Sequence, residues 1–269
     1  MTIQAALDQQ VELESLFDSH QELSLDVAHV TRALRDGYKQ PVLILDLDIV
    51  RQKYDRFKAA MPGIGAHYAV KANPDLRVLE ALKGQGSKFE IASIQELDLL
   101  LSIGVDISTV HYSNPVKPSS FIKYAASKGV RWFAFDSKEE LVKIKNIVPD
   151  AKLYLRFDTP NIGSDWPLSG KFGAKIRDID DILDMAIEVN ADLCGLTFHV
   201  GSQCRNVDNW NQAIDTAKKI FKKMVNLGLK PELLNIGGGY PVRLTKPIPS
   251  IEYIGRVIKK ALEGFDGEI

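Results

Sequence analysis

Strand-like and helix-like segments alternate along most of the 269-residue chain. Short runs rich in β-branched and aromatic residues are followed by amphipathic runs with apolar residues three and four positions apart. The candidate strands are Val42–Asp46, Ala66–Val70, Lys88–Ile91, Thr109–Tyr112, Trp132–Phe135, Lys152–Phe157, Leu193–Val200 and Leu233–Ile236. Because parallel strands need a crossover connection, usually a helix, these repeated units predict an α/β fold with a parallel sheet. The pattern leaves two arrangements open, an open doubly wound sheet and a closed (β/α)8 barrel.

Residues typical of helix ends fall between the candidate strands. Asn73-Pro74 predicts a helix N-cap followed by proline at the first helical position. Ser93 and Glu96 match a capping box directly after a strand. The clearest amphipathic helix covers Ala213–Val225, and we expect its lysines to form the solvent-exposed face.

Composition and charge narrow the class of protein. A net charge of −1 gives no electrostatic reason to expect nucleic acid or an anionic membrane as a partner. No apolar run reaches the ~18 residues typical of a membrane span. Cys194 and Cys204 are too few for a disulfide framework and fit a reducing compartment. No Lys or Arg precedes Arg32, which argues against a secretory signal or a mitochondrial transit peptide and predicts a cytoplasmic location.

Chemically distinctive residues follow or end several candidate strands. They are Lys71, Glu90, Arg156, His199 and the triple glycine Gly237–Gly239. In a barrel, the catalytic residues gather at the C-terminal ends of the strands. The sequence therefore predicts one shared site at that end of the sheet.

Lys71 can be interpreted as a surface charge, an anion clamp or a Schiff-base nucleophile. Most lysines are exposed, so the surface interpretation is the default. The flanking strand and the Asn73-Pro74 helix start predict instead a partly desolvated cleft. Desolvation disfavours the ammonium form and lowers a lysine pKa from its usual ~10.4. That change would favour attack on a carbonyl carbon.

The triple glycine is a candidate phosphate site. Without side chains, several backbone N–H groups can approach an anion closely. The alternative is a tight turn that needs positive φ. Ser202, just after His199, is a second candidate phosphate ligand and favours the functional interpretation.

The remaining candidates also carry structural alternatives. His199 is either a satisfied core histidine or a ring that stacks on a planar cofactor. Arg156 needs an anionic or polar partner if it is buried. Glu96 is first a helix cap, and Cys194 is interpreted as packing. A Schiff-base lysine, a stacking histidine and a phosphate cradle together predict pyridoxal 5′-phosphate, with no metal.

Seven ordered motifs carry a family resemblance: "HYAVKANPD", "FEIAS", "YSNPVKP", "FAFDS", "SGKFGA", "FHVGSQ" and "NIGGGYP". The chain resembles the pyridoxal phosphate-dependent ornithine/diaminopimelate/arginine decarboxylases, which have an alanine racemase-like (β/α)8 barrel. The resemblance covers residues 42–269 and implies a pyridoxal phosphate-binding barrel there. Residues 1–41 would be an acidic segment and a lead-in to a β domain.

The resemblance implies roles for individual residues. Lys71 would hold the cofactor as a Schiff base and His199 would stack on its ring. Glu90, where aspartate is common, and Arg156 would help to place that ring. The other implied roles are phosphate binding by Ser202, Gly237, Gly238 and Gly239, support of the site by Glu96, and contacts to a second subunit of a homodimer by Asp136 and Lys171.

The implied activity is decarboxylation of a basic amino acid. "NPVKP" and "FDS" resemble eukaryotic-type ornithine decarboxylases, which implies L-ornithine as substrate, putrescine as product and a role in polyamine synthesis. The alternatives are lysine, arginine, diaminopimelate or carboxynorspermidine as substrate, or a non-catalytic regulatory homologue. Retention of Lys71, Ser202 and Gly237–Gly239 argues for an active enzyme.

The sequence departs from the family pattern at its end. It stops at "GFDGEI", before the Glu-Pro-Gly-Arg motif that the family carries on the last barrel strand. The resemblance therefore implies a truncated barrel without its eighth strand, and no C-terminal β domain. We expect an open barrel seam and little or no turnover from the 269 residues alone.

Overall fold

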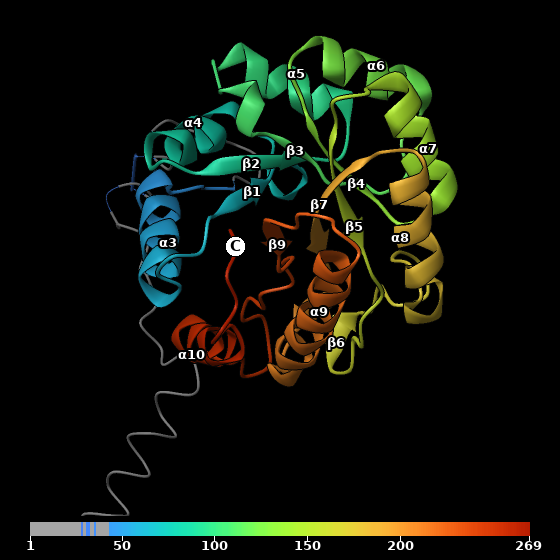
Figure 1. Cartoon of the computed structure of the whole chain (residues 1–269). Helices are drawn as coiled ribbons and strands as arrows, with labels where there is room; N and C mark the ends of the chain where they lie inside the picture. The colour runs from blue at the N-terminus through green and yellow to red at the C-terminus, as the bar shows by residue number, and fades with distance from the viewer. Residues whose placement is uncertain (1–27, 29–30, 33–34, 36–42) are drawn as a thin grey trace, which may run out of the picture.

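A computed structural model describes residues 28, 31, 32, 35 and 43–269. Its centre is a seven-stranded sheet in the order β1-β2-β3-β4-β5-β7-β9, and every neighbouring pair is parallel. The strands are β1 (His67–Ala69), β2 (Lys88–Ile91), β3 (His111–Tyr112), β4 (Trp132–Phe135), β5 (Lys152–Arg156), β7 (Asp192–Thr197) and β9 (Leu233–Asn235). The sheet curls around a central axis with helices on its outer side (Figure 1). This arrangement confirms the α/β prediction and selects the barrel, here incomplete, over the open sheet.

Helices cover the outside of the curled sheet. They are α3 (Leu47–Ala60), α4 (Leu76–Gly84), α5 (Ile94–Ser102), α6 (Ser119–Ser127), α7 (Lys138–Ile147), α8 (Ile179–Glu188), α9 (Asp208–Asn226) and α10 (Ile251–Ala261), with the short 3₁₀ helices η1 (Val70–Ala72), η2 (Ile107–Thr109) and η3 (Ile176–Asp178). Helix α9 extends the predicted Ala213–Val225 segment at both ends. Its apolar face is buried and three of its lysines, Lys219, Lys222 and Lys223, are exposed, as predicted.

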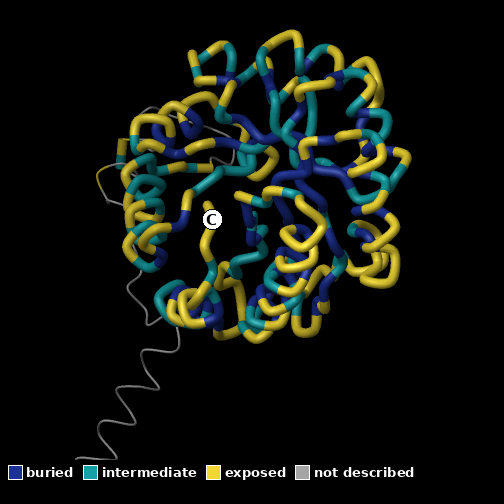
Figure 2. Tube along the Cα trace, in the orientation of Figure 1, coloured by how far each residue is buried: buried dark blue, intermediate teal, exposed yellow. Residues whose placement is uncertain are grey.

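The core lies between the inner sheet and the surrounding helices (Figure 2). Phe89, Phe133, Leu153 and Leu196 from four strands are fully buried. Full burial of each such side chain contributes about 1.5–3 kcal/mol. This packing fixes the strand ends, and therefore the side chains that follow them.

Two predicted boundaries before α4 are wrong. Residues 43–46 form no strand, because Asp46 Oδ1 accepts hydrogen bonds from the N–H groups of Asp48 and Ile49 and caps α3 instead. Position 42 lies outside the described residues. The N-cap of α4 is Asp75 and not Asn73. Asn73 Oδ1 accepts from Asp75 N, so the chain makes one more turn before the helix begins.

A small antiparallel pair was not predicted from the sequence. It consists of β6 (Ser164–Trp166) and β8 (Ser202–Cys204). Gln203 in its second strand has a φ of 54°, an uncommon conformation for a residue with a side chain. The pair lies beyond the C-terminal end of β7 and so borders the predicted site.

The barrel is open between β1 and β9, the two edges of the sheet. The chain end lies in this gap (Figure 1). Glu268 forms a parallel bridge with Leu233 of β9, and Gly65, just before β1, donates its N–H to Ile269 O at 2.6 Å. These last residues therefore lie between the two edges of the sheet and contact both.

Candidate active site

Two adjoining cavities, of about 660 and 260 Å³, share lining residues at the C-terminal ends of the strands, and the larger also extends along the open seam to Ala66 and Leu233. The smaller is also lined by Arg156 and Ser202, and the larger by Gly238 and Gly239. The polar or glycine residues that line both are Lys71, Glu90, His199, Asn235 and Gly237. The structure thus gathers most of the predicted site residues around one junction.

Lys71 lies at the junction but is not desolvated. It follows β1 in the single turn η1, and the residue is exposed. The residue lines both cavities, but its exposure does not confirm the predicted partial desolvation. Its charge acts on both Glu90 and His199.

The triple glycine forms a tight loop after β9. Gly237 has a φ of 68° and Gly239 a φ of 90°. A Cβ on Gly237 would lie 2.1 Å from Phe198 O, and one on Gly239 would lie 2.1 Å from Gly201 O. Side chains are therefore excluded at both positions by space and by backbone conformation. The tight-turn and anion-site interpretations of this loop are compatible.

The loop presents backbone donors to a ligand. Gly237 N–H is used within the protein, since it donates to Asn235 Oδ1 at 2.8 Å. Within the described part of the chain, the N–H groups of Gly238 and Gly239 and the hydroxyl of Ser202 have no hydrogen-bond partner. These three groups fit an anion such as a phosphate.

His199 is held as a neutral ring. Burial lowers its pKa to about 4, with further lowering from the charges of Arg156 and Lys71. Its Nδ1 accepts a hydrogen bond from Gly201 N at 3.0 Å, which fixes the ring orientation. A neutral imidazole with a fixed plane that lines both cavities fits the predicted stacking role.

Glu90 is the third residue of β2 and lines both cavities. Burial raises its pKa, while Ser113, Lys71, Asn235 and Arg156 oppose that rise. Ser113 Oγ donates to Glu90 Oε2 at 2.8 Å. The carboxylate therefore has a fixed direction in the site.

Arg156, at the end of β5, is half-buried and packs on Phe172, with its guanidinium carbon 5.1 Å from the ring centroid. Burial lowers its pKa, opposed by Asp136, Glu90 and Asp158. In the described residues it has no ion pair within 4.0 Å, so its predicted anionic partners act on it from a greater distance.

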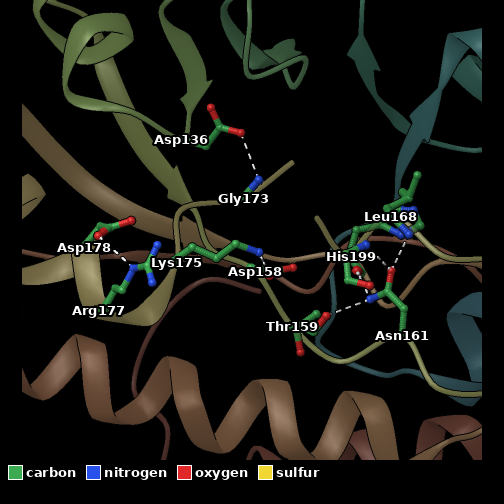
Figure 3. Close-up of polar contacts among 11 residues, drawn as sticks. Asp136, Asp158, Thr159, Asn161, Leu168, Gly173, Lys175, Arg177, Asp178 and His199 are labelled. Atoms are coloured by element: carbon green, nitrogen blue, oxygen red, sulfur yellow. Dashed lines mark hydrogen bonds and ion pairs between the residues drawn. The ribbon is translucent and has the colours of Figure 1, made fainter. Parts of the chain in front are cut away.

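The two predicted dimer residues lie on neighbouring segments. Asp136 Oδ2 accepts a hydrogen bond from Gly173 N at 2.9 Å (Figure 3). Lys171 is exposed, with Nζ 4.8 Å from the Trp166 ring centroid. Their contacts to a second subunit stay a prediction.

Glu96 and Cys194 fit their structural interpretations. Glu96 N is capped by Ser93 Oγ, which confirms the predicted N-cap, and Glu96 Oε2 accepts from Ala92 N at 2.7 Å. The same side chain lines the smaller cavity, consistent with support of the site. Cys194 is buried within β7, and burial raises the pKa of its thiol to about 12.

Sequence reasoning missed three residues around the junction. Asn161 is buried, and its Nδ2 donates to Thr159 O and His199 O, while its Oδ1 accepts from Leu168 N and Ser169 N (Figure 3). It ties the segments on both sides of β6 to the loop that follows β7. Ser113 Oγ donates a hydrogen bond to Glu90 Oε2, and Asn235 Oδ1 accepts one from Gly237 N. Their place just after β3 and at the last position of β9 is the signal that could have identified them.

Comparison with known proteins identifies the family of the chain. Residues 47–268 match the profile described as pyridoxal-dependent decarboxylase, pyridoxal binding domain. The chain belongs to the pyridoxal-dependent decarboxylase family. This confirms the resemblance of the seven motifs and, at the level of the family, the predicted pyridoxal phosphate cofactor.

Individual relatives include an ornithine decarboxylase and an antizyme inhibitor. The chain is 37% identical over 227 residues to mouse ornithine decarboxylase, covering 84% of this chain and 49% of the relative. It is 38% identical over 220 residues to antizyme inhibitor 2 of Xenopus laevis, covering 82% and 48%. The chain thus spans about half the length of the curated relatives it matches.

Solved structures confirm the barrel class. The lysine/ornithine decarboxylase from Vibrio vulnificus, complexed with putrescine, is 32% identical with a TM-score of 0.81, over 90% of this chain and 64% of that one.

In the described residues, no helix is long and apolar enough to cross a membrane, and no cluster of at least three potential ligands could hold a metal ion.

Proposed function

We propose that the chain binds pyridoxal 5′-phosphate at the junction of the two cavities and serves decarboxylation of a basic amino acid. We further propose L-ornithine as the substrate and putrescine as the product, within polyamine synthesis. One observation carries the proposal: Lys71, His199 and the unpartnered N–H groups of Gly238 and Gly239 all line the larger cavity.

The residues present fit this cofactor. The Lys71 amine can bind its aldehyde carbon, and the N–H groups of Gly238 and Gly239 with the Ser202 hydroxyl can bind its phosphate. The Cβ contacts at Gly237 and Gly239 show that the loop backbone packs closely against the strand end after β7, which leaves no room for side chains in the cradle. When bound, the pyridoxal ring delocalises the electron pair left as CO2 departs.

The protein's own groups prepare that chemistry. Neutral His199 can cover one face of a planar ring without adding a positive charge, because its pKa is about 4. Glu90 and Arg156 both line the smaller cavity and can bring opposite charges to it. The two charges would orient the ring, and the Glu90 carboxylate would favour positive charge near Lys71.

The remaining parts of the proposal concern assembly and location. We propose a homodimer with Asp136 and Lys171 near the second subunit, and a cytoplasmic location. Their support is the family membership.

Two alternatives have specific support. The similarity to a lysine/ornithine decarboxylase favours lysine as a second substrate candidate, beside arginine, diaminopimelate and carboxynorspermidine. The similarity to antizyme inhibitor 2 favours a regulatory role without turnover. Both alternatives have the same fold. The first predicts decarboxylation of a different amino acid, and the second predicts no decarboxylation at all.

The test is chemical trapping followed by a substrate comparison. After incubation with pyridoxal phosphate and borohydride reduction, peptide mapping should find the pyridoxyl group on Lys71. Lys71→Ala should abolish it, whereas Lys219→Ala, an exposed lysine on α9, should not. In a protein of the relatives' full length, about twice that of this chain, release of CO2 should then be greatest with L-ornithine. Trapping on other lysines alone would contradict the cofactor site, and trapping without release from any candidate amino acid in that longer protein would favour the regulatory role.

A further inference from the structure

A chain of three side chains connects the barrel core to Glu90. Ser113 follows β3, and its Oγ donates to Glu90 Oε2 at 2.8 Å. Tyr154 from β5 places its hydroxyl 3.1 Å from the same Oγ. Tyr154 is fully buried, whereas Ser113 and Glu90 line the smaller cavity. The contacts join β2, β5 and the segment that follows β3.

The chemistry of the three groups fixes the direction of these bonds. When Glu90 is ionised, its carboxylate only accepts hydrogen bonds, so Ser113 gives its single hydroxyl proton to Glu90. Tyr154 must then donate to Ser113 Oγ. Burial raises the pKa of Tyr154, so its phenol keeps the proton that this direction requires.

We propose that Ser113, oriented by Tyr154, is a positioning residue that holds Glu90 ionised and directed into the cavity junction beside Lys71. This inference rests on the proposed binding of pyridoxal phosphate at Lys71. It gives Glu90 its function: the carboxylate stabilises positive charge at Lys71 Nζ, whether the amine is free or joined to the cofactor aldehyde.

The groups around Glu90 show why the hydrogen bond from Ser113 matters for its ionised form. Charged and titratable groups around it are Lys71, His111, Tyr154, Arg156 and His199, with the neutral amide of Asn235. Burial disfavours the carboxylate, while Lys71, Arg156, Asn235 and Ser113 favour it. Because Lys71 is exposed, solvent weakens its contribution. A direct hydrogen bond from Ser113 is therefore a main support of the ionised form.

The experiment measures cofactor retention at Lys71 against pH. Each variant is incubated with pyridoxal phosphate over a pH series and reduced with borohydride, and the pyridoxyl-Lys71 peptide is quantified by mass spectrometry. In Ser113→Ala, loss of a hydrogen bond to a charged group should move the acid midpoint of trapping upward by about one pH unit. Tyr154→Phe should move it in the same direction by less.

Two controls isolate the mechanism. Ser137→Ala removes a hydroxyl that caps α7 and lines neither cavity, and it should leave the midpoint unchanged. In a Glu90→Gln background, Ser113→Ala should cause no shift, because no carboxylate remains to titrate. An unchanged midpoint in both Ser113→Ala and Tyr154→Phe, or an equal shift with and without Glu90, would overturn the inference. If the unmodified chain shows no pyridoxyl-Lys71 at any pH, the proposed function fails and the inference with it.

Discussion

Gly239→Ala tests whether the glycine loop is built for close backbone approach to an anion. The added Cβ would lie 2.1 Å from Gly201 O, so either the loop or the carbonyl must move by about 1 Å to restore an ordinary contact. The residue also has a φ of 90°, which costs a residue with a Cβ about 1–2 kcal/mol. Relief of the overlap adds about 1–3 kcal/mol. The expected loss in the free energy of unfolding is therefore about 2–5 kcal/mol.

The same displacement moves the Gly239 N–H away from the phosphate position. Loss of one charge-assisted hydrogen bond is worth about 1.5–3 kcal/mol, so the dissociation constant for pyridoxal phosphate should rise about 10- to 100-fold. Urea unfolding of the free chain and a fluorescence titration with pyridoxal phosphate measure the two effects separately.

Gly264→Ala is the matched control. Gly264 also has positive φ, at 73°, but a Cβ there meets nothing within 4 Å. It should lose about 1–2 kcal/mol of stability from backbone conformation alone and keep the cofactor affinity unchanged. Equal affinities of Gly239→Ala and the unmodified chain would refute the assignment of this loop to phosphate.

Three further substitutions test the packing around the site. Burial, aided by Lys88, lowers the pKa of His67 from 6.5 to about 4, so its neutral form stabilises the fold above pH 6.5 and this contribution is lost as the pH falls toward 4. In urea unfolding, His67→Phe should reduce this acid loss of stability by up to about 3 kcal/mol, and an unchanged pH dependence would contradict the assignment. Asn161→Ala should lower the free energy of unfolding by about 2–4 kcal/mol because buried carbonyl and N–H groups lose their partners; a change below 1 kcal/mol would argue against that role. Lys117→Ala removes the buried one of the two lysines that pair with the Glu140 carboxylate and should cost about 3–5 kcal/mol by the same measurement, whereas a neutral result would show that Lys143 alone satisfies Glu140.

The sequence predicts strands well where apolar runs have clear ends. The bounds of β2 and β4 agree with the sequence-based ranges, because each run is followed by polar residues that start a helix. Residues 43–46 have a strand-like composition too, but the Asp46 side chain offers the backbone an alternative set of hydrogen bonds. Composition alone does not reveal that competition.

Residues at strand ends were predictable as a group, since parallel strands bring their C-terminal ends to one side. Lys71, Glu90 and His199 meet there as expected. Individual environments were not predictable. The exposure of Lys71 depends on how the single turn η1 is oriented, and the contacts of Asn161 join residues 38 positions apart in the chain. Such bonds depend on the packed fold and leave no local sequence signal.

The most direct test of the account is a crystal structure of the chain after incubation with pyridoxal phosphate and borohydride reduction. The account predicts continuous density from Lys71 Nζ to a phosphate bound by the N–H groups of Gly238 and Gly239, with the His199 ring parallel to the pyridine. A pyridoxyl group on Lys71 whose phosphate lies away from these glycines would contradict the central claim that one cofactor joins the two parts of the site.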